Sequence, residues 1–313
     1  MTKHLHRDID LTFNENTLKS LYNISSLSKK VCISGEGDPL AEWKSILKII
    51  DNGPENQHYE LITSSYWNES RTLQLIQKLS NSCLKKHSRL AYRISIDKFH
   101  AEETARDILS ILLNIFSTNK FNNVSLQIRS LTGQENYLFH RIKEYFEGHK
   151  ITYEICQTSK IEYEVYSKVS TIKIQFKPSV FPSKFNYNDS WNITNYINYL
   201  ENKRQTEFHI GHLKYSEENP VYDITINPNG DVVLYGAESF IIGNIEEEVL
   251  NCKTIRERVN STPSLKHLVS KRFIHHIEEW NEVEETKKLI ESVNNPFWVV
   301  RNLSKNNLLK LNT

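Results

Sequence analysis

The sequence lacks a long hydrophobic run and a net charge of either sign. No stretch is apolar for long enough to span a bilayer, and residues 1–8 are polar and contain no apolar signal region. We therefore expect no membrane contact and a cytoplasmic location. The 39 Lys and Arg residues balance 38 Asp and Glu residues. Because no overall field draws in polyanions, we expect no nucleic-acid partner.

The sequence also lacks any grouping of its four cysteines, Cys32, Cys83, Cys156 and Cys252. There is no Cys-x-x-Cys pair and no mixed His and Cys box, which disfavours both a metal site and a disulfide framework. Cys32 and Cys156 lie in strand-like runs, where cysteine behaves as a small hydrophobic residue. We predict that both pack in the core.

What the sequence does contain is a regular alternation of strand and helix patterns over its first 178 residues. The predicted strands are 31–33, 59–63, 91–96, 124–128, 151–155 and 172–176. Repeated βα units imply parallel strands with right-handed crossovers, in either an open doubly wound sheet or a barrel-like one. In both arrangements, ligands bind at the carboxyl ends of the strands.

A second module is expected after residues 178–192, which are rich in proline and asparagine and therefore mark a boundary. Residues 222–226 and 232–235 flank an Asn-Gly pair, which predicts a β-hairpin, and the remainder has mainly helical patterns. We predict two domains, residues 1–178 and residues 179–313.

The loop of residues 34–40, between the first strand and its helix, is the strongest candidate for a ligand site. Gly35 and Gly37 allow a ligand to approach the backbone closely, and Asp38-Pro39 begins a helix whose free N–H groups need acceptors. The loop is equally explained as a plain βα turn that caps its helix, because short glycine motifs often match by chance.

The same loop resembles a motif of radical SAM enzymes. Gly37-Asp38-Pro39 is similar to their Gly-Gly-Glu/Asp-Pro motif, which lines the S-adenosylmethionine pocket, with Glu36 in the place of the first glycine. Residues 93–100 are similar to the Ser-x-Asp-Gly-Phe-His pattern on the fourth strand of that family. Residues 226–231 and Gly243-Asn244-Ile245 are similar to the Pro-x-Gly and Leu-Gly-Asn-Ile patterns of the family's SPASM or twitch extension.

The resemblance implies an α/β fold in which an incomplete radical SAM-like partial (β/α) barrel with parallel strands precedes a small α+β twitch-like module. It implies that Glu36, Gly37 and Asp38 contact the amino group of S-adenosylmethionine. It also implies that Ser95 and Asp97 face the ribose or the carboxylate.

Thr63 and Ser64, which end the intervening strand, are weaker candidates for the same pocket. The family's Cys-x-x-x-Cys-x-x-Cys motif is absent, together with the first barrel strand and the cluster loop. Iron in such clusters is held by thiolates, so we expect no 4Fe–4S cluster and no radical catalysis from this chain alone.

Two functions remain open at this point. The first is a cluster-less relative that acts as a binding or assembly partner in a peptide- or protein-modifying system, with a protein or peptide partner and a residual S-adenosylmethionine pocket. The alternative is a radical SAM enzyme whose cluster loop is missing from this chain or is supplied by another.

His209 and His212 have the spacing of half a metal site. No carboxylate or thiol at ligand spacing accompanies them, so we predict a solvated or hydrogen-bonded pair.

Overall fold

The structure is a computed structural model that describes residues 12–35, 38–65, 67–97, 107–177, 192–293 and 295–309. The chain forms two compact units. Unit 1 comprises Met1–His6 and Ile24–Lys177, and unit 2 comprises Arg7–Asn23 and Pro178–Thr313. The division after Lys177 falls at the start of the proline- and asparagine-rich stretch in which the sequence predicts a boundary.

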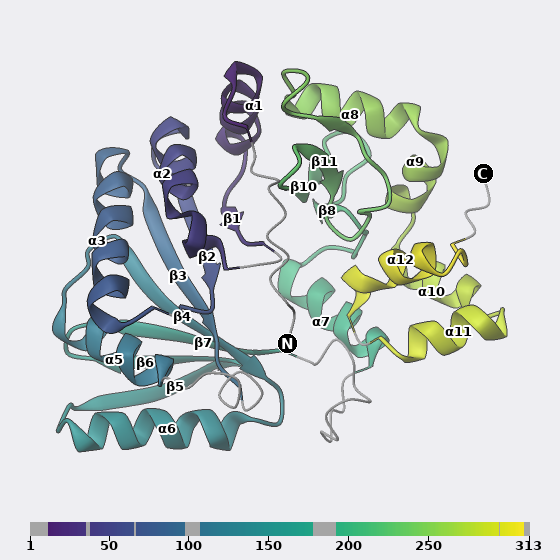
Figure 1. The fold of residues 1–313 in the computed structure, drawn as a ribbon. Coiled ribbons are helices and arrows are strands. Elements are labelled where there is room, and N and C mark those ends of the chain that lie inside the picture. Colours follow the sequence, from purple (N-terminus) through teal and green to yellow (C-terminus); the bar gives the residue numbers. More distant parts are fainter. Residues whose placement is uncertain are drawn as a thin grey trace. The chain divides into compact units, whose positions relative to one another are not determined.

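Unit 1 is an α/β unit built on a seven-stranded, mostly parallel sheet (Figure 1). Its strands are β1 (Val31–Ile33), β2 (His58–Thr63), β3 (Arg89–Ser95), β4 (Val124–Leu131), β5 (Tyr153–Ser159), β6 (Glu162–Ser167) and β7 (Thr171–Lys177). They lie in the order β1-β2-β3-β4-β7-β6-β5. The first five strands of this order pair in parallel, whereas β6 is antiparallel to both β7 and β5.

The β5–β6 hairpin corrects the expectation that every strand of this region is parallel. β5 is the strand expected at residues 151–155, but it pairs antiparallel with β6, which the sequence pattern did not predict. Within β6 only Val165 is buried. A single buried apolar residue gives no periodic signal, which is why the strand was missed.

The helices that connect the parallel strands lie on one face of the sheet (Figure 1). They are α2 (Trp43–Asn52), α3 (Glu69–Lys85), α5 (Ile108–Thr118) and α6 (Glu135–Gly148). Tyr92 of β3 meets Phe116 of α5 with ring centroids 6.5 Å apart, and Phe176 of β7 meets Phe139 of α6 at 5.6 Å. Because the strand order advances from β1 to β7 without reversing, the parallel part is wound as in a barrel and not doubly wound.

The two faces of this sheet differ in chemistry, because successive side chains of a strand point to opposite faces. The face toward the helices is apolar, and Leu61, Ile94, Ile128 and Ile174 are almost fully buried on it. The other face, which we call the polar face, includes the apolar Ile62, Ala91 and Leu131 but is mainly polar. Its polar residues include Cys32, Glu60, Arg93, Gln127, Arg129, Glu162, Glu164, Lys173 and Gln175. Parallel strands are usually apolar on both faces, so a polar face needs an explanation.

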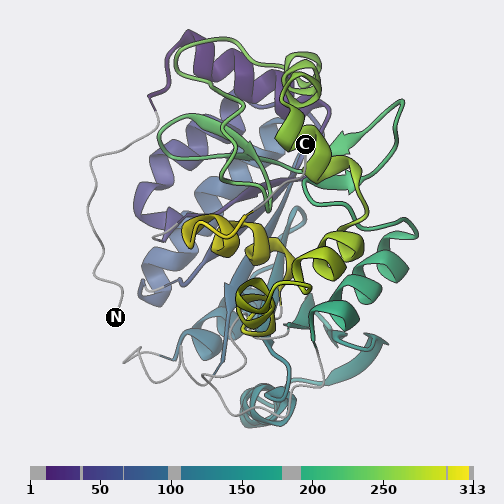
Figure 2. The same cartoon turned by 90° about the vertical axis from the view of Figure 1, so that its right-hand side faces the viewer.

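Unit 2 combines small sheets with short helices. Its strands are β8 (His212–Lys214), β9 (Val221–Tyr222), β10 (Ile224–Ile226), β11 (Asp231–Leu234) and β12 (Gly243–Asn244). Its helices include α7 (Ile193–Arg204), α8 (Cys252–Ser261), α9 (Pro263–Ser270), α10 (Phe273–Trp280), α11 (Glu284–Glu291) and α12 (Pro296–Lys305). Figure 2 shows α10, α11 and α12 in yellow tones, and these helices and α7 pack against one another.

The predicted hairpin of this unit is confirmed as β10–β11, which pair antiparallel. At its turn, Gly230 has a φ of +83° and its N–H donates to the Asn227 carbonyl at 2.9 Å. A left-handed φ of this kind favours glycine, so the Asn-Gly signal was correct.

Helix α1 (Glu15–Ser26) begins in unit 2, far in sequence from its partners. Asn14 Nδ2 donates to the Glu246 carbonyl at 3.0 Å, and the Leu250 N–H donates to Ser20 Oγ at 2.8 Å. These hydrogen bonds hold the first part of the chain against the β12–α8 connection.

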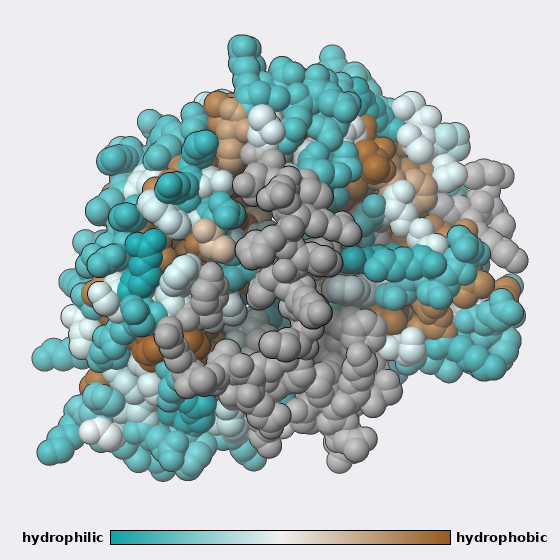
Figure 3. Space-filling model, viewed as in Figure 1, coloured by the Kyte–Doolittle hydropathy of each residue, from teal (hydrophilic) through white to brown (hydrophobic). Residues whose placement is uncertain are grey.

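The visible surface of the described residues is mostly hydrophilic, and hydrophobic residues show on it as separate patches (Figure 3). Within the described part of the chain, no helix has the length and apolar character that crossing a membrane requires.

Candidate functional site

The loop after β1 is joined to the loop after β2 by one carboxylate. Asp38 caps the turn η1 (Pro39–Glu42), where its Oδ1 accepts the Leu40 N–H at 2.9 Å. Thr63 Oγ1 donates to the same carboxylate, 2.7 Å from Oδ1. Oδ2 accepts the backbone N–H of Ser64 at 2.9 Å, the Ser64 hydroxyl, and the Ser65 N–H at 3.2 Å. We call these five residues the Asp38 clamp.

Ser65 extends the clamp to the third strand. Its backbone has a φ of +53°, its side chain is fully buried, and its Oγ lies 2.8 Å from the hydroxyl of Tyr92 on β3. Burial raises the pKa of Tyr92 well above its ordinary value, so this hydroxyl stays protonated. Hydrogen bonds therefore connect the loops after β1 and β2 to the middle of β3.

These contacts test whether the predicted pocket residues fit S-adenosylmethionine. A carboxylate offers about four lone-pair sites, and the donors of Leu40, Thr63, Ser64 and Ser65 already occupy those of Asp38. Asp38 is therefore engaged by the chain and does not present a free acceptor to an ammonium group. The hydrogen bonds account for Asp38, Thr63 and Ser64 without a ligand.

The other predicted pocket residues are not part of the Asp38 clamp. Ser95 ends β3 and is partly exposed, and Asp97, two residues later, is 4% exposed. Both follow a strand that neighbours β2, so they lie at the same edge of the sheet as the Asp38 clamp. Glu36 and Gly37 lie outside the described residues. Their assignment to S-adenosylmethionine stays a prediction.

The cysteines do not fit an iron–sulfur cluster. Cys32 on β1 and Cys156 on β5 belong to strands at opposite edges of the sheet, and Cys83 is buried in α3. Six strand spacings of about 4.8 Å separate the two edges. Burial, and then Asp51, raise the pKa of Cys83 to about 12. The thiolate ligands of a cluster must lie close together, so the positions of these thiols disfavour iron.

The prediction that Cys32 and Cys156 pack in the core is wrong. Cys32 is exposed and Cys156 is partly exposed. Cys32 Sγ lies 3.4 Å from Glu60 Oε2 on the polar face. Desolvation, followed by the charge of Glu60, raises the pKa of Cys32 to about 11, so its thiol is a weak nucleophile at neutral pH.

The polar face contains a buried ion-pair cluster that sequence reasoning missed. Arg93 Nη1 lies 2.8 Å from Glu60 Oε2, and Lys30 Nζ lies 3.0 Å from the same oxygen. Desolvation alone would raise the pKa of Glu60, but Arg93 and Lys30 outweigh it, so the pKa falls below its usual value and Glu60 is ionised.

Arg93 is left with an unmatched donor. It is 8% exposed, and its buried Nε has no hydrogen-bond partner among the described residues. An unpaired buried donor costs about 1–3 kcal/mol in folding.

The polar face continues across the sheet as a chain of paired groups. Arg129 Nη2 donates to Gln175 Oε1 at 3.3 Å, and Gln175 Nε2 donates to Glu162 Oε1 at 2.9 Å. Lys173 Nζ lies 3.7 Å from Glu164 Oε1. Strict alternation in residues 124–131 and 171–177 is the sequence signal that could have found this face.

His209 and His212 of unit 2 are buried. Of the two predicted arrangements, a solvated pair or a hydrogen-bonded pair, the solvated one is therefore wrong. They are 3% and 4% exposed, and the His209 ring stacks on Tyr215 with centroids 3.7 Å apart. His209 Nδ1 lies 3.3 Å from the Val269 carbonyl, whereas neither ring nitrogen of His212 has a hydrogen-bond partner in the part of the chain that the structure describes. Among the described residues, no three His, Cys, Asp or Glu side chains are placed to hold a metal ion.

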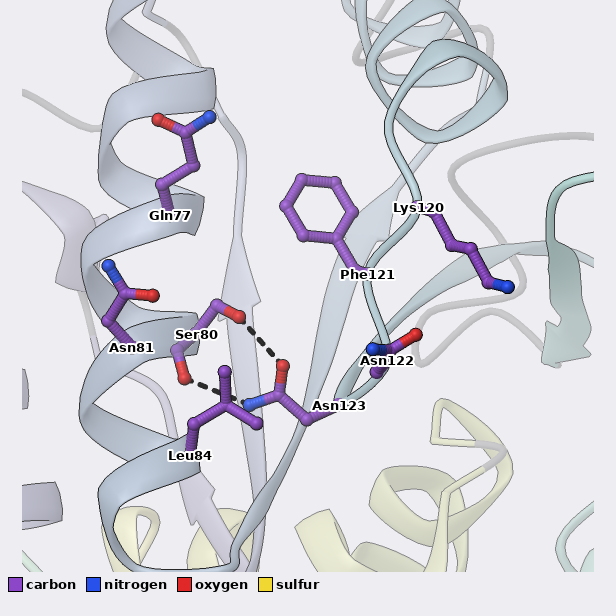
Figure 4. Close-up of a pocket in the computed structure, with 8 residues that line it drawn as sticks. All are labelled: Gln77, Ser80, Asn81, Leu84, Lys120, Phe121, Asn122 and Asn123. Carbon is purple, nitrogen blue, oxygen red and sulfur yellow. Dashed lines mark hydrogen bonds between the residues drawn. The ribbon is translucent and has the colours of Figure 1, made fainter.

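A hollow of about 370 Å³ lies between α3 and the segment that precedes β4 (Figure 4). Phe121 points toward α3 in this view, whereas Lys120 points away. Asn123 anchors the wall, because its side chain exchanges hydrogen bonds with Ser80 at 2.7 and 2.9 Å. The hollow lies at the amino end of β4, opposite to the edge where ligands of parallel sheets bind.

No protein-family model matches this sequence, and no curated protein matches it. The function must therefore be argued from the geometry of the chain itself.

The Asp38 clamp makes a first testable prediction about stability. Asp38→Ala leaves several donors without an acceptor, so we expect the free energy of unfolding to fall by about 3 kcal/mol. The matched control is Asn68→Ala, which removes the N-cap of α3 and a single bond from the Arg71 N–H. It should cost about 1 kcal/mol. Urea unfolding measures both variants, and equal losses would contradict a clamp that does more than cap a turn.

The burial of His212 leads to a second prediction, which concerns the pH dependence of stability. Burial, and then the charge of His209, lower the pKa of His212 to about 4. In the unfolded chain His212 therefore takes up a proton near pH 6.5, whereas in the folded chain it does so only near pH 4. The free energy of unfolding falls as the pH falls from 6.5 toward 4. His212→Phe should remove roughly 3 kcal/mol of this loss.

The control for that experiment is His275→Phe, at an exposed position of α10. Urea unfolding at pH 7, 5.5 and 4, followed by tryptophan fluorescence, compares each variant with the parent chain. A His212→Phe variant that loses as much stability as the parent between pH 7 and pH 4 would show that His212 does not titrate in this way.

Proposed function

We propose that this chain is a cluster-less radical SAM-like protein that binds a peptide or protein partner in a peptide- or protein-modifying system. We further propose that the polar face of unit 1 is the surface that binds this partner. The observation that carries the proposal is the division of the sheet into two faces. The connecting helices cover the apolar face, and the other face carries polar residues on neighbouring strands, from Glu60 on β2 to Glu162 and Glu164 on β6.

The dimensions of the polar face suit an extended chain better than a small molecule. Seven strands at about 4.8 Å spacing give a width of about 29 Å, which an extended peptide of about nine residues would span. The side chain of Lys173 is 59% exposed and that of Glu164 is 23% exposed, so a partner can reach them.

The chemistry of the face also suits a peptide. It offers both positive and negative groups, together with the amides of Gln127 and Gln175, and these can pair with peptide groups and with charged side chains. Cys32 and Cys156 lie on the two edge strands of the sheet, which favours a binding role over radical chemistry by this chain alone.

The proposal predicts that charge reversal on the polar face changes peptide binding. The full chain is applied to an array of nine-residue peptides of defined sequence, and the dissociation constants of the retained peptides are measured in solution. We expect Lys173→Glu to change these constants at least tenfold, because it reverses one charge of the binding surface.

The matched control is Lys143→Glu on α6. Lys143 also has a 59% exposed side chain and also lies 3.7 Å from a glutamate oxygen, that of Glu147, but it is on a helix. Its effect should stay below twofold. If the two variants change the dissociation constants equally, the polar face is not the surface that binds the peptide.

A second readout separates the proposal from the enzyme alternative. The chain is incubated anaerobically with ferrous iron and sulfide, and iron is then measured after desalting. We expect no iron at the stoichiometry of a 4Fe–4S cluster. Iron at that stoichiometry would contradict a cluster-less protein.

A further inference from the structure

We infer that Arg93 on the polar face binds a carboxylate of the peptide partner, an inference that rests on the function proposed above. The carboxylate is either the carboxyl terminus of the peptide or an Asp or Glu side chain. Both sources present the same planar pair of oxygens.

The first observation behind this inference is the orientation of the Arg93 hydrogen bonds. One nitrogen, Nη1, is paired with Glu60 at 2.8 Å. The Nε atom belongs to the other edge of the guanidinium group, is buried, and has no partner among the described residues. An arginine presents parallel N–H groups along such an edge, and their spacing matches the two oxygens of a carboxylate.

The second observation is an excess of positive charge in the same place. Lys30 and Arg93 together carry two positive charges, and both pair with the single carboxylate of Glu60. The cluster is therefore left with one net positive charge. Arg93 and Glu60 are 8% and 4% exposed, so water screens this charge poorly. An anion is the ligand that such a site favours.

The register of the sheet places an amide side chain beside Arg93. Gln127 on β4 lies directly opposite Arg93 on the same face, and its side-chain amide can donate hydrogen bonds to an anion. At the other side of the cluster, the Lys30 side chain is 45% exposed, so the cluster reaches solvent at Lys30.

The experiment uses the full chain with ¹⁵N-labelled arginine and three small probes. N-acetylglycine carries a terminal carboxylate, N-acetylglutamic acid α-amide carries a side-chain carboxylate, and N-acetylglutamine amide carries neither. The Nε–H resonance of Arg93 is identified by its absence in Arg93→Lys. We expect at least one carboxylate probe to shift this resonance in a saturable manner and the amide probe to leave it in place.

The two carboxylate probes identify the source of the anion. A shift with N-acetylglycine alone assigns the peptide terminus, and a shift with the glutamic acid amide alone assigns an acidic side chain. The inference is overturned if neither carboxylate moves the resonance, or if the amide probe moves it equally.

Two variants then test the guanidinium edge. Arg93→Lys keeps the positive charge but loses the planar edge, so the dissociation constant of the active probe should rise at least tenfold. Arg89→Lys, at an exposed position of the same strand, should change it less than twofold. Titration of the backbone amides of β3 and β4 gives these constants. An unchanged constant in Arg93→Lys would overturn the inference, and the wild-type titration decides the question by itself if that variant does not fold.

The carboxylate experiment can fail independently of the peptide-binding experiment that tests the proposed function. If no array peptide binds but a carboxylate probe shifts Arg93, the anion site stands and the peptide function fails. If array peptides bind and no carboxylate shifts Arg93, the peptide function stands and this inference fails.

Discussion

The structure of unit 1 depends on the alternation of side chains along strands whose helices all lie on one side. A helix on each face would require apolar residues at every strand position. With helices on one face only, every second residue is released from packing against the helices. Gln127 and Arg129 on β4 and Lys173 and Gln175 on β7 occupy these released positions. The polar face is thus a direct consequence of the direction in which the chain winds.

The Asp38 clamp serves a different purpose from the polar face. It links the loops that follow β1 and β2, and through Ser65 it reaches Tyr92 of β3. Loops at the carboxyl ends of strands have few neighbours, so hydrogen bonds to one shared carboxylate fix their positions. A resemblance to a cofactor motif and a structural cap can therefore involve the same residue, and the donors around Asp38 favour the structural role.

The sequence predicted most elements of the fold, because apolar residues repeat at strand and helix spacing from β1 to β4 and again in β7. It did not predict β6, where only Val165 is buried, or the pairing of α1 with residues 246–250, which are more than 200 positions away. Pairings over such distances leave no local pattern.

The candidate site was predicted only in part. Asp38, Thr63 and Ser64 are in contact, as strand ends of a parallel sheet should be, but the Glu60–Arg93 pair was missed. Those residues lie in the middle of strands otherwise rich in apolar residues, and their pairing depends on register. The cysteines were misjudged for the same reason, since a strand pattern does not say which face a residue occupies.

The most direct test of the central claim is carboxylate labelling of the full chain, with and without a saturating array peptide. Carbodiimide and glycine ethyl ester modify accessible carboxylates, and mass spectrometry locates them. The account predicts that the peptide reduces labelling of Glu162 and Glu164 on the polar face and leaves Glu144 and Glu147 of α6 unchanged. Unchanged labelling of Glu162 and Glu164 in the presence of bound peptide would contradict it.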